Sequence, residues 1–443
     1  MKYVLISFLL LFSIHAFSEI PYQDEKFGCL TAVVANKYIN DFHINVKSFG
    51  GLELCNSEVD TKKLLNDIDI VANGQFAGNG QNNLIRNFVA PNNYYDWMKQ
   101  QTRGVERGND VPYATAYNSG GYFTMQDGWA SSSTLGRVGT FIHEARHTQG
   151  YRHISCAQGP YFGSGLSGCD ENYSYGGSHA VEMEYYANVS VNGLNFHPVY
   201  KKMARLMAMA RSNFVFNTSP MKTREGVLAL AMDRKSAMLY DNGNWVSREV
   251  PQASGRLKRT SFGGVLFDGS SAYSIDLYQN SGFVDLVSDT YSYFKLLLER
   301  KLQIKDFEEF DAGAKRYVVQ MTNNKMAMFD FPSGSWGQAQ SLPFDAVKFS
   351  TAIPGQTKSG LYIINTKNEI YIYQLQTQRL ISQAGAWDTT NKEVITFAGQ
   401  NLILKADGRT YVQSANNLQA WDTQNLFSEI TTVPIYDAFE VVK

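Results

Sequence analysis

The chain has 443 residues, more than one ordinary hydrophobic core organises, so two or three domains are expected. Hydrophobic residues make up 44% of it and charged residues 18%, the composition of a folding chain. Lys and Arg number 40 against 41 Asp and Glu, a formal net charge of −1. This balance argues against a nucleic-acid-binding protein and against a polybasic membrane-surface protein, because both usually carry a basic excess.

The first eighteen residues have the features of a secretory signal peptide. A basic start is followed by an apolar run over residues 3–14 and by the small-x-small cleavage pattern Ala16-Phe17-Ser18. The run is shorter than the ~20 residues of a spanning helix, and no cysteine follows it as a lipid attachment point. We expect residues 1–18 to be removed. The mature protein, beginning at Glu19, is then secreted or periplasmic and has no transmembrane segment.

The four cysteines all lie in the first part of the chain. An even number of cysteines in an exported protein predicts disulfides, and four cysteines allow three pairings. The sequence does not choose among these pairings. We expect the one that closes the shortest loops, Cys29 with Cys55 and Cys156 with Cys169.

Residues 19–219 have the mixed pattern of an α+β domain. Helical patterns cover residues 135–149, 179–191 and 198–212. Two short strand-like runs within residues 113–126 flank Asn118-Ser119-Gly120-Gly121, which predicts a hairpin.

Residues 220–443 have a different, repetitive pattern. Five segments each contain an apolar strand, a tight turn and a second strand of alternating residues. The turns lie near Asp233, Asp268, Asn323, Asn368 and Asp407, roughly 35 to 55 residues apart. A propeller blade takes ~40–50 residues and four strands, so an all-β propeller of five blades is expected. A β-sandwich or a barrel is the alternative, and residues 291–310 have a helical pattern that predicts an insertion between blades.

One stretch brings three of the seven histidines within eleven residues: His143 and His147 with Glu144 between them, then Gly150 and His153. On a helix, His143 and His147 project from one face, so both imidazoles can meet one ion. Zinc suits neutral imidazole, and a catalytic zinc site takes three protein ligands and a water molecule. Glu144 is placed to reach that water. Gly150 allows a positive φ after the helix, so that His153 can return as the third ligand.

This H-E-x-x-H-x-x-G-x-x-H pattern resembles the signature of the metzincin group of zinc metallopeptidases. The resemblance covers the motif and, more loosely, the chain up to about residue 215. It implies a zincin-like metallopeptidase domain over residues 19–219. By this resemblance, His143, His147 and His153 bind one Zn²⁺ per chain and Glu144 is the general base.

The metzincins also place a methionine turn beneath the metal, for which Met183-Glu184-Tyr185 is the candidate. Tyr185 would then stabilise the oxyanion or act as a fifth ligand. The sequence departs from the group here, because the pattern around Met183 is helical. A helix that carries Glu182 instead resembles the other large H-E-x-x-H group, in which a downstream glutamate is the third ligand. Glu182 therefore stays open as the alternative to His153.

These patterns together predict an exported zinc metalloendopeptidase that hydrolyses a peptide or protein substrate with a zinc-activated water and Glu144 as base. The hairpin within residues 113–126 would pair with an extended peptide, and the propeller would bind a protein or surface ligand. Two alternatives stay open. One is a secreted binding or adhesion protein whose zinc site is structural or inactive, and the other is a zinc hydrolase of cell-wall amide linkages.

Overall fold

A computed structural model describes residues 19–20, 22, 27–78, 82–111, 114–250, 254–269, 271–278, 284–285, 304–356, 360–414 and 417–439. The expected signal peptide, residues 1–18, lies outside the described residues. Within them, no helix is both long enough and apolar enough to cross a membrane.

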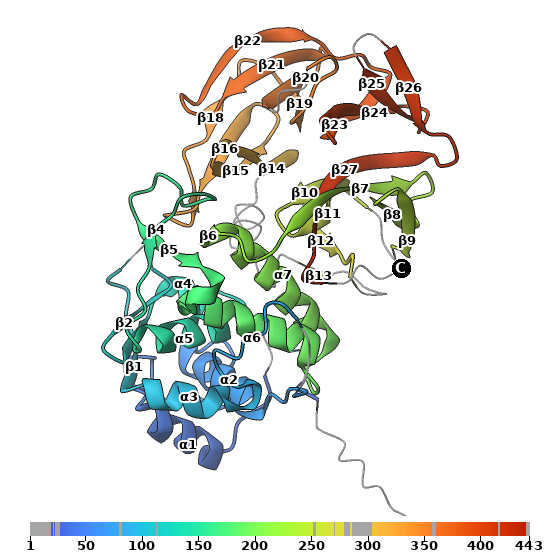
Figure 1. Cartoon of the computed structure of the whole chain (residues 1–443). Helices are drawn as coiled ribbons and strands as arrows, with labels where there is room; N and C mark the ends of the chain where they lie inside the picture. Colours follow the sequence, from blue (N-terminus) through green and yellow to red (C-terminus); the bar gives the residue numbers. More distant parts are fainter. Residues whose placement is uncertain are drawn as a thin grey trace, which may run out of the picture.

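The first part of the chain is mainly helical, and Figure 1 shows its helices gathered at one end of the molecule. They are α1 (Ala32–Phe42), α2 (Asp60–Asn73), η1 (Pro91–Asn93), α3 (Tyr94–Gln101), α4 (Asp127–Ala130), α5 (Thr134–His147), η2 (Tyr173–Tyr175), α6 (Ser178–Asn192) and α7 (Pro198–Phe214). The helices expected over residues 135–149, 179–191 and 198–212 are confirmed as α5, α6 and α7.

Two small sheets accompany these helices. The first has the order β1-β3-β2, with β1 (Gly104–Arg107) parallel to β3 (Tyr122–Met125) and β2 (Ala116–Ser119) antiparallel to it. The expected hairpin is therefore confirmed as β2–β3, and Gly120 and Gly121 form its turn with φ of 62° and 98°. The second sheet has the order β4-β5-β6 and consists of Ile154–Ser155, Ser167–Asn172 and Phe216–Thr218.

Helix α5 lies at the centre of the helical part and packs against α2, α3, α6 and strand β2. Its first turn is capped by Ser133, whose side chain accepts the N–H of Gly136. The guanidinium of Arg137 binds both carboxylate oxygens of Asp67 on α2, at 2.9 and 3.0 Å, and both side chains are buried. Apolar side chains such as Phe141 are also fully buried, each contributing ~1.5–3 kcal/mol. The helix is thus fixed on several sides.

Both expected disulfides are present. Cys29 is joined to Cys55, and Cys156 to Cys169. The second bond links the segment after β4 to strand β5, so it ties together two strands that also pair by hydrogen bonds. Disulfides are typical of proteins that fold in oxidising compartments, and their presence agrees with the expected export.

The remainder of the described chain is β-sheet, arranged in five small antiparallel sheets (Figure 1). They are β10-β11-β12-β13 (Arg256–Thr260, Gly263–Phe267, Ala272–Ile275, Val284–Asp285); β14-β15-β16-β17 (Asp306–Ala312, Lys315–Met321, Lys325–Asp330, Ser335–Trp336) with β18 (Gln340–Ser341) beside β16; β19-β20-β21-β22 (Ala346–Ser350, Leu361–Asn365, Glu369–Gln374, Arg379–Ala386); β23-β24-β25-β26 (Asn391–Phe397, Gln400–Lys405, Thr410–Ser414, Asn417–Asp422); and β27-β7-β8-β9 (Phe427–Tyr436, Thr223–Ala231, Ser236–Asp241, Asn244–Glu249).

Each of the five repeated sequence segments forms the central hairpin of one of these sheets, as expected. The first strands of the sheets also contact one another in a cyclic order: β10 with β14, β14 with β19, β19 with β23, β23 with β27, and β27 with β10. Strand β27 completes the sheet that begins with β7, so this part of the chain starts and finishes in one sheet. The helical insertion expected over residues 291–310 is wrong at its end, because residues 306–312 form strand β14; residues 291–303 lie outside the described residues.

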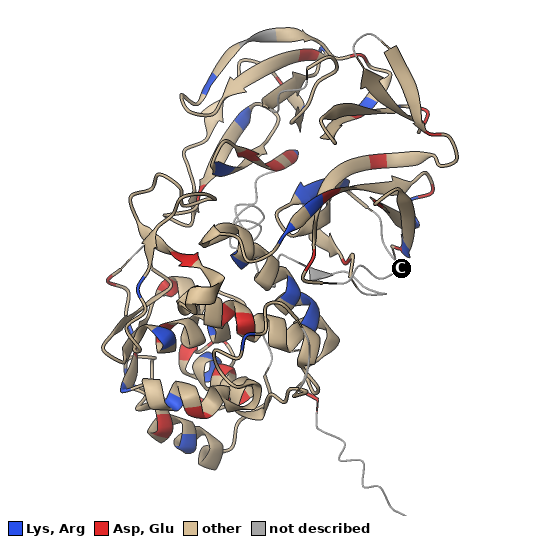
Figure 2. Ribbon diagram, in the orientation of Figure 1, with Lys and Arg blue, Asp and Glu red and all other residues tan. Residues whose placement is uncertain are grey.

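Charged residues of both signs lie on these first strands (Figure 2), and Lys258, Asp306 and Lys348 among them are buried. Lys258 on β10 lies 2.9 Å from both Asp306 and Glu308 on β14, and Arg256 binds Asp306 at 3.0 Å. Lys348 on β19 binds Glu393 on β23 at 3.3 Å, and Arg256 reaches the same carboxylate. Burial opposes the ionisation of Asp306, yet the charges of Arg256 and Lys258 hold its pKa below the ordinary value. These ion pairs cross from one sheet to its neighbours.

The helical and sheet parts meet where the loop after β4 lies against strand β15. The N–H of Gly159 donates to the carbonyl of Ala314 at 2.8 Å, and the ring of Tyr161 contacts that of Phe331. The predicted boundary between residues 219 and 220 falls between β6 and β7.

Candidate metal centre

Three histidines converge at the end of helix α5. His143 and His147 are one turn apart on the helix, which ends at His147. Gly150 then takes a φ of 90°, as expected, and the chain turns back so that His153 faces the helix. Nε2 of His143 lies 2.9 Å from Nε2 of His153 and 3.2 Å from Nε2 of His147. The ligand atoms of all three lie within 4.8 Å of one another, as one metal ion requires.

The opposite ring nitrogens have oxygen partners. Nδ1 of His147 lies 2.5 Å from the carbonyl of Tyr151 and 3.0 Å from the hydroxyl of Ser178. Nδ1 of His153 lies 3.1 Å from Asp170, and Nδ1 of His143 lies 3.3 Å from Glu182. Imidazoles that donate from Nδ1 to these oxygens direct the lone pairs of Nε2 at one point. Three lone pairs at this spacing repel one another unless a cation lies between them, so the donor set fits zinc.

The site also favours the neutral imidazole that metal binding needs. Burial lowers the pKa of all three histidines, and the neighbouring His179 adds to the effect. For His153 the pKa falls to about 4. The metal-free cluster therefore stays uncharged at neutral pH and needs no deprotonation before it binds a cation.

Glu144 is buried beside His143. Its side chain is 4% exposed, and its Oε2 has no hydrogen-bond partner within the described part of the chain. Burial raises its pKa to about 8, with a smaller effect from the charge of Glu182. A buried carboxyl oxygen without a partner is costly to keep, which is typical of a group reserved for a ligand or a water molecule.

Strand β2 lies directly against this helix. The side-chain amide of Asn118 donates to the carbonyl of Glu144 and to the hydroxyl of Thr148, the latter at 2.8 Å. Because β2 is paired on only one side, with β3, it is an edge strand of its sheet. The hairpin therefore lies next to the helix that carries His143 and His147.

The alternative ligand Glu182 occupies a different place from His153. Its Oε2 lies against Nδ1 of His143, on the far side of the ring from the point where the Nε2 atoms meet. Its Oε1 accepts hydrogen bonds from Arg211 and Tyr186. In this arrangement His153 completes the cluster, and Glu182 supports one of its members from behind.

Met183, the candidate for a methionine turn, lies inside helix α6, in agreement with the helical pattern of this stretch, so it forms no turn. Tyr185 is corrected by the structure: its ring packs edge-to-face against Tyr94 and Phe76 in the core and is fully buried. Residues 182 and 186 are one turn apart on the helix and face α5 together, whereas residue 185 projects to the side. The tyrosine of α6 that contacts the groups behind the histidines is therefore Tyr186.

Several residues of the site were not found from the sequence. Asp170 accepts hydrogen bonds from the N–H groups of His179 and Ala180 as well as approaching His153. It thus joins the start of α6 to the cluster. His179 is buried, and its ring stacks on that of His153 at 4.4 Å between centroids. The contacts of Asp170 and His179 with His153 could not be predicted from the spacing of these residues along the chain.

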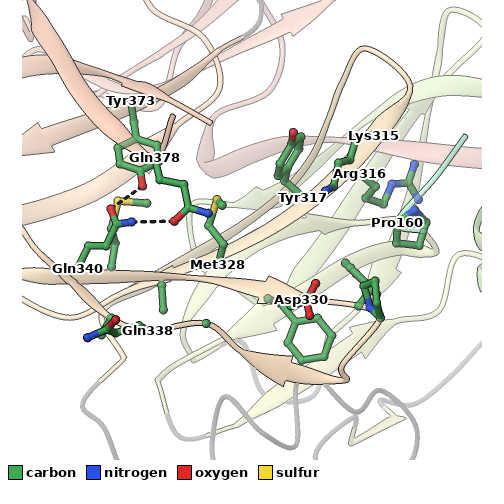
Figure 3. A pocket seen from close by; sticks show the side chains of 17 residues that line it. Pro160, Lys315, Arg316, Tyr317, Met328, Asp330, Gln338, Gln340, Tyr373 and Gln378 are labelled. Carbon is green, nitrogen blue, oxygen red and sulfur yellow. Dashed lines mark hydrogen bonds between the residues drawn. The ribbon is translucent and has the colours of Figure 1, made fainter. Parts of the chain in front are cut away.

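A pocket of about 600 Å³ lies elsewhere, beside strands β15 and β16. Figure 3 shows Gln340, Tyr373 and Gln378 joined by hydrogen bonds at one end, and Tyr317 and Pro160 at the other. Its lining contains no histidine, so we place the candidate centre at the histidine cluster on chemical grounds.

Comparison with known proteins identifies no relative. No protein-family model and no curated protein matches the chain. The solved structures that match include BBS1N in complex with ARL6DN, at 10% identity and a TM-score of 0.25 over 49% of this chain and 66% of that one. They also include the N-terminal domain of Nup159 (16%, 0.21, 46% and 51%) and a putative exported protein of Bacteroides fragilis (10%, 0.24, 45% and 54%). The chain spans between 39% and 66% of the length of the first three neighbours, and likeness at these TM-scores carries no conclusion about function.

Proposed function

We propose that this chain is an exported zinc-dependent peptidase whose metal is held by His143, His147 and His153. The observation that carries the proposal is the convergence of three Nε2 atoms next to the buried, unpartnered carboxyl oxygen of Glu144. A structural zinc site usually has four protein ligands, whereas a catalytic site has three and an open position. Three histidines with an adjacent carboxyl match the second arrangement.

Bound zinc would polarise the scissile carbonyl and lower the pKa of a bound water molecule toward about 7. The chain's own residues then have separate tasks. Glu144 accepts the proton of the attacking water and returns it to the leaving amine. Asp170 and the carbonyl of Tyr151 keep the imidazoles of His153 and His147 oriented through their Nδ1 atoms.

The edge strand β2 supports a peptide as the substrate. An extended peptide can add to a free strand edge through main-chain hydrogen bonds. The side-chain amide of Asn118 on β2 donates a hydrogen bond to the carbonyl of Glu144. A peptide paired with the edge of β2 would therefore lie close to the three histidines. A substrate without a peptide backbone would not use this edge.

We propose that the sheet part, residues 220–443, is a five-bladed propeller. Its five sheets have contacting first strands in cyclic order, and β27 completes the sheet of β7. In a propeller each blade packs through its innermost strand, and the ring is closed when two ends of the chain share a blade. We propose that this part binds a protein or surface ligand and so places the peptidase near its substrate.

The test begins with the zinc content of the purified mature protein, where one ion per chain is expected. Peptide-library and cell-wall amide substrates are then assayed with wild type, with Glu144→Gln and with the surface control Glu58→Gln. Zinc retained in Glu144→Gln with peptide cleavage lost, and an active control, would support the proposal. If only the cell-wall amides were cleaved, the chain would be an amidase and not a peptidase. Zinc without hydrolysis of either class would favour a binding protein, and absence of zinc from metal-replete wild type would refute the metal site.

A further inference from the structure

The buried groups behind His143 form a connected set that the catalytic proposal does not require. Glu182 on α6 is fully buried and has two separately occupied carboxylate oxygens. Oε1 accepts hydrogen bonds from Arg211 on α7, from Nε at 3.0 Å and Nη2 at 2.7 Å, and from the hydroxyl of Tyr186 at 3.0 Å. Oε2 lies 3.3 Å from Nδ1 of His143 and 3.5 Å from Nδ1 of His179, and these three side chains are themselves close enough to hold a metal ion.

Arg211 makes this buried carboxylate tolerable. Burying an unpaired carboxylate costs several kcal/mol, and a guanidinium that binds it offsets much of this cost. Because Arg211 and Tyr186 both bind Oε1, they also fix the plane of the carboxylate. The hydrogen bonds of Arg211 and Tyr186 to Oε1 therefore also fix the position of Oε2, the oxygen that faces His143.

A glycine on α5 provides the room for this arrangement. Gly139 lies one helical turn before His143. A Cβ atom at this position would overlap the hydroxyl of Tyr186 and would lie 3.0 Å from Oε1 of Glu182. Any larger residue would push these two groups away from the helix, and with them the partner of His143.

We propose that Glu182, held by Arg211 and Tyr186 in the space left by Gly139, is a positioning residue that orients His143 and strengthens zinc binding at the cluster. The inference rests on the proposed zinc site. A carboxylate on the outer nitrogen of a metal-bound histidine fixes its tautomer and ring orientation, and losing such a partner typically weakens metal binding 10–100-fold. Glu182 does this without contacting substrate.

The experiment measures zinc affinity of the full mature chain by competition with a chromogenic chelator, together with the visible spectrum of the Co²⁺-loaded protein. Glu182→Gln removes the charge and changes the partner of His143. The matched control is Glu184→Gln on the same helix, because Glu184 is equally buried but accepts from the backbone N–H groups of Arg86 and Val89. Gly139→Ala is the second test variant, since it displaces the carboxylate without altering it.

We expect both test variants to lose about 10–100-fold in zinc affinity and to shift the Co²⁺ spectrum, while Glu184→Gln keeps the wild-type spectrum. A wild-type zinc affinity in Glu182→Gln would overturn this inference but not the proposed function. The same would follow if Glu184→Gln lost as much zinc affinity and shifted the Co²⁺ spectrum as much as Glu182→Gln. Two zinc ions per wild-type chain, with one lost in Glu182→Gln, would also overturn it by making Glu182 a ligand. Absence of zinc from the wild type would instead refute the proposed function itself.

Discussion

The buried carboxyl of Glu144 should make the metal-free protein less stable as the pH rises, and Glu144→Gln should remove this dependence. Burial, and to a smaller extent Glu182, raises the pKa of Glu144 from 4.5 to about 8. Between these two values the folded state binds more protons than the unfolded chain. The stability that the neutral carboxyl contributes is therefore fully present below pH 4.5 and is lost progressively as the pH rises toward about 8.

The size of the effect follows from the shift, because each pKa unit corresponds to about 1.4 kcal/mol. From about pH 5 to about pH 8, wild type should lose about 3.5 kcal/mol relative to Glu144→Gln. The lowered histidine pKa values act on both proteins and cancel in this difference. Urea unfolding of chelator-treated protein, followed by helical circular dichroism at several pH values, measures it.

Glu58→Gln serves as the control, since Glu58 is exposed on the surface. It should leave the pH dependence of wild type unchanged. A difference between wild type and Glu144→Gln that is the same at about pH 5 and about pH 8 would refute the reasoning, because it would show that the buried carboxyl titrates as it does in the unfolded chain.

Three further outcomes are expected. His153→Ala should weaken zinc binding by more than Glu182→Gln does, as measured by chelator competition; an unchanged affinity would exclude His153 as a ligand. Replacing Cys156 and Cys169 together by Ser should lower the free energy of unfolding by about 3 kcal/mol. It should also weaken zinc binding, because the bond joins the segment just after His153 and β4 to strand β5, which carries Asp170; stability measured by denaturant unfolding and zinc affinity should fall together. Val433→Asp on β27, at a fully buried apolar position, should disrupt the sheet part and make it sensitive to limited proteolysis, and a resistant variant would contradict the role of β27.

The sequence could predict the parts of the site that depend on local spacing. His143 and His147 share a helix face because four residues make about one turn, and Gly150 marked the point where the chain leaves the helix. The same reasoning predicted the five hairpins, whose alternating strands and short turns are local features. The pairing of the cysteines was also found, because the shortest loops were the ones closed.

The sequence could not predict contacts made across the fold. Whether His153 or Glu182 completes the cluster depends on where α6 packs against α5, which no local pattern determines. Tyr185 was assigned to the site through the resemblance to the metzincins, but on helix α6 its ring packs among the aromatic rings of Phe76 and Tyr94. Arg211 comes from a third helix, and Asp170 from a strand beyond the disulfide loop, so their contacts appear only once the elements are assembled.

Strand β27 has a consequence for how the sheet part can fold. Its partner β7 is synthesised before the other four sheets, whereas β27 follows all of them. Until β27 is present, β7 keeps one edge open, with apolar residues such as Val227 and Leu228 beside it. Open apolar edges promote association between chains, and pairing over such a sequence distance is slow. This edge is therefore the place where a newly made chain most needs protection, and its final pairing is a natural late step of folding.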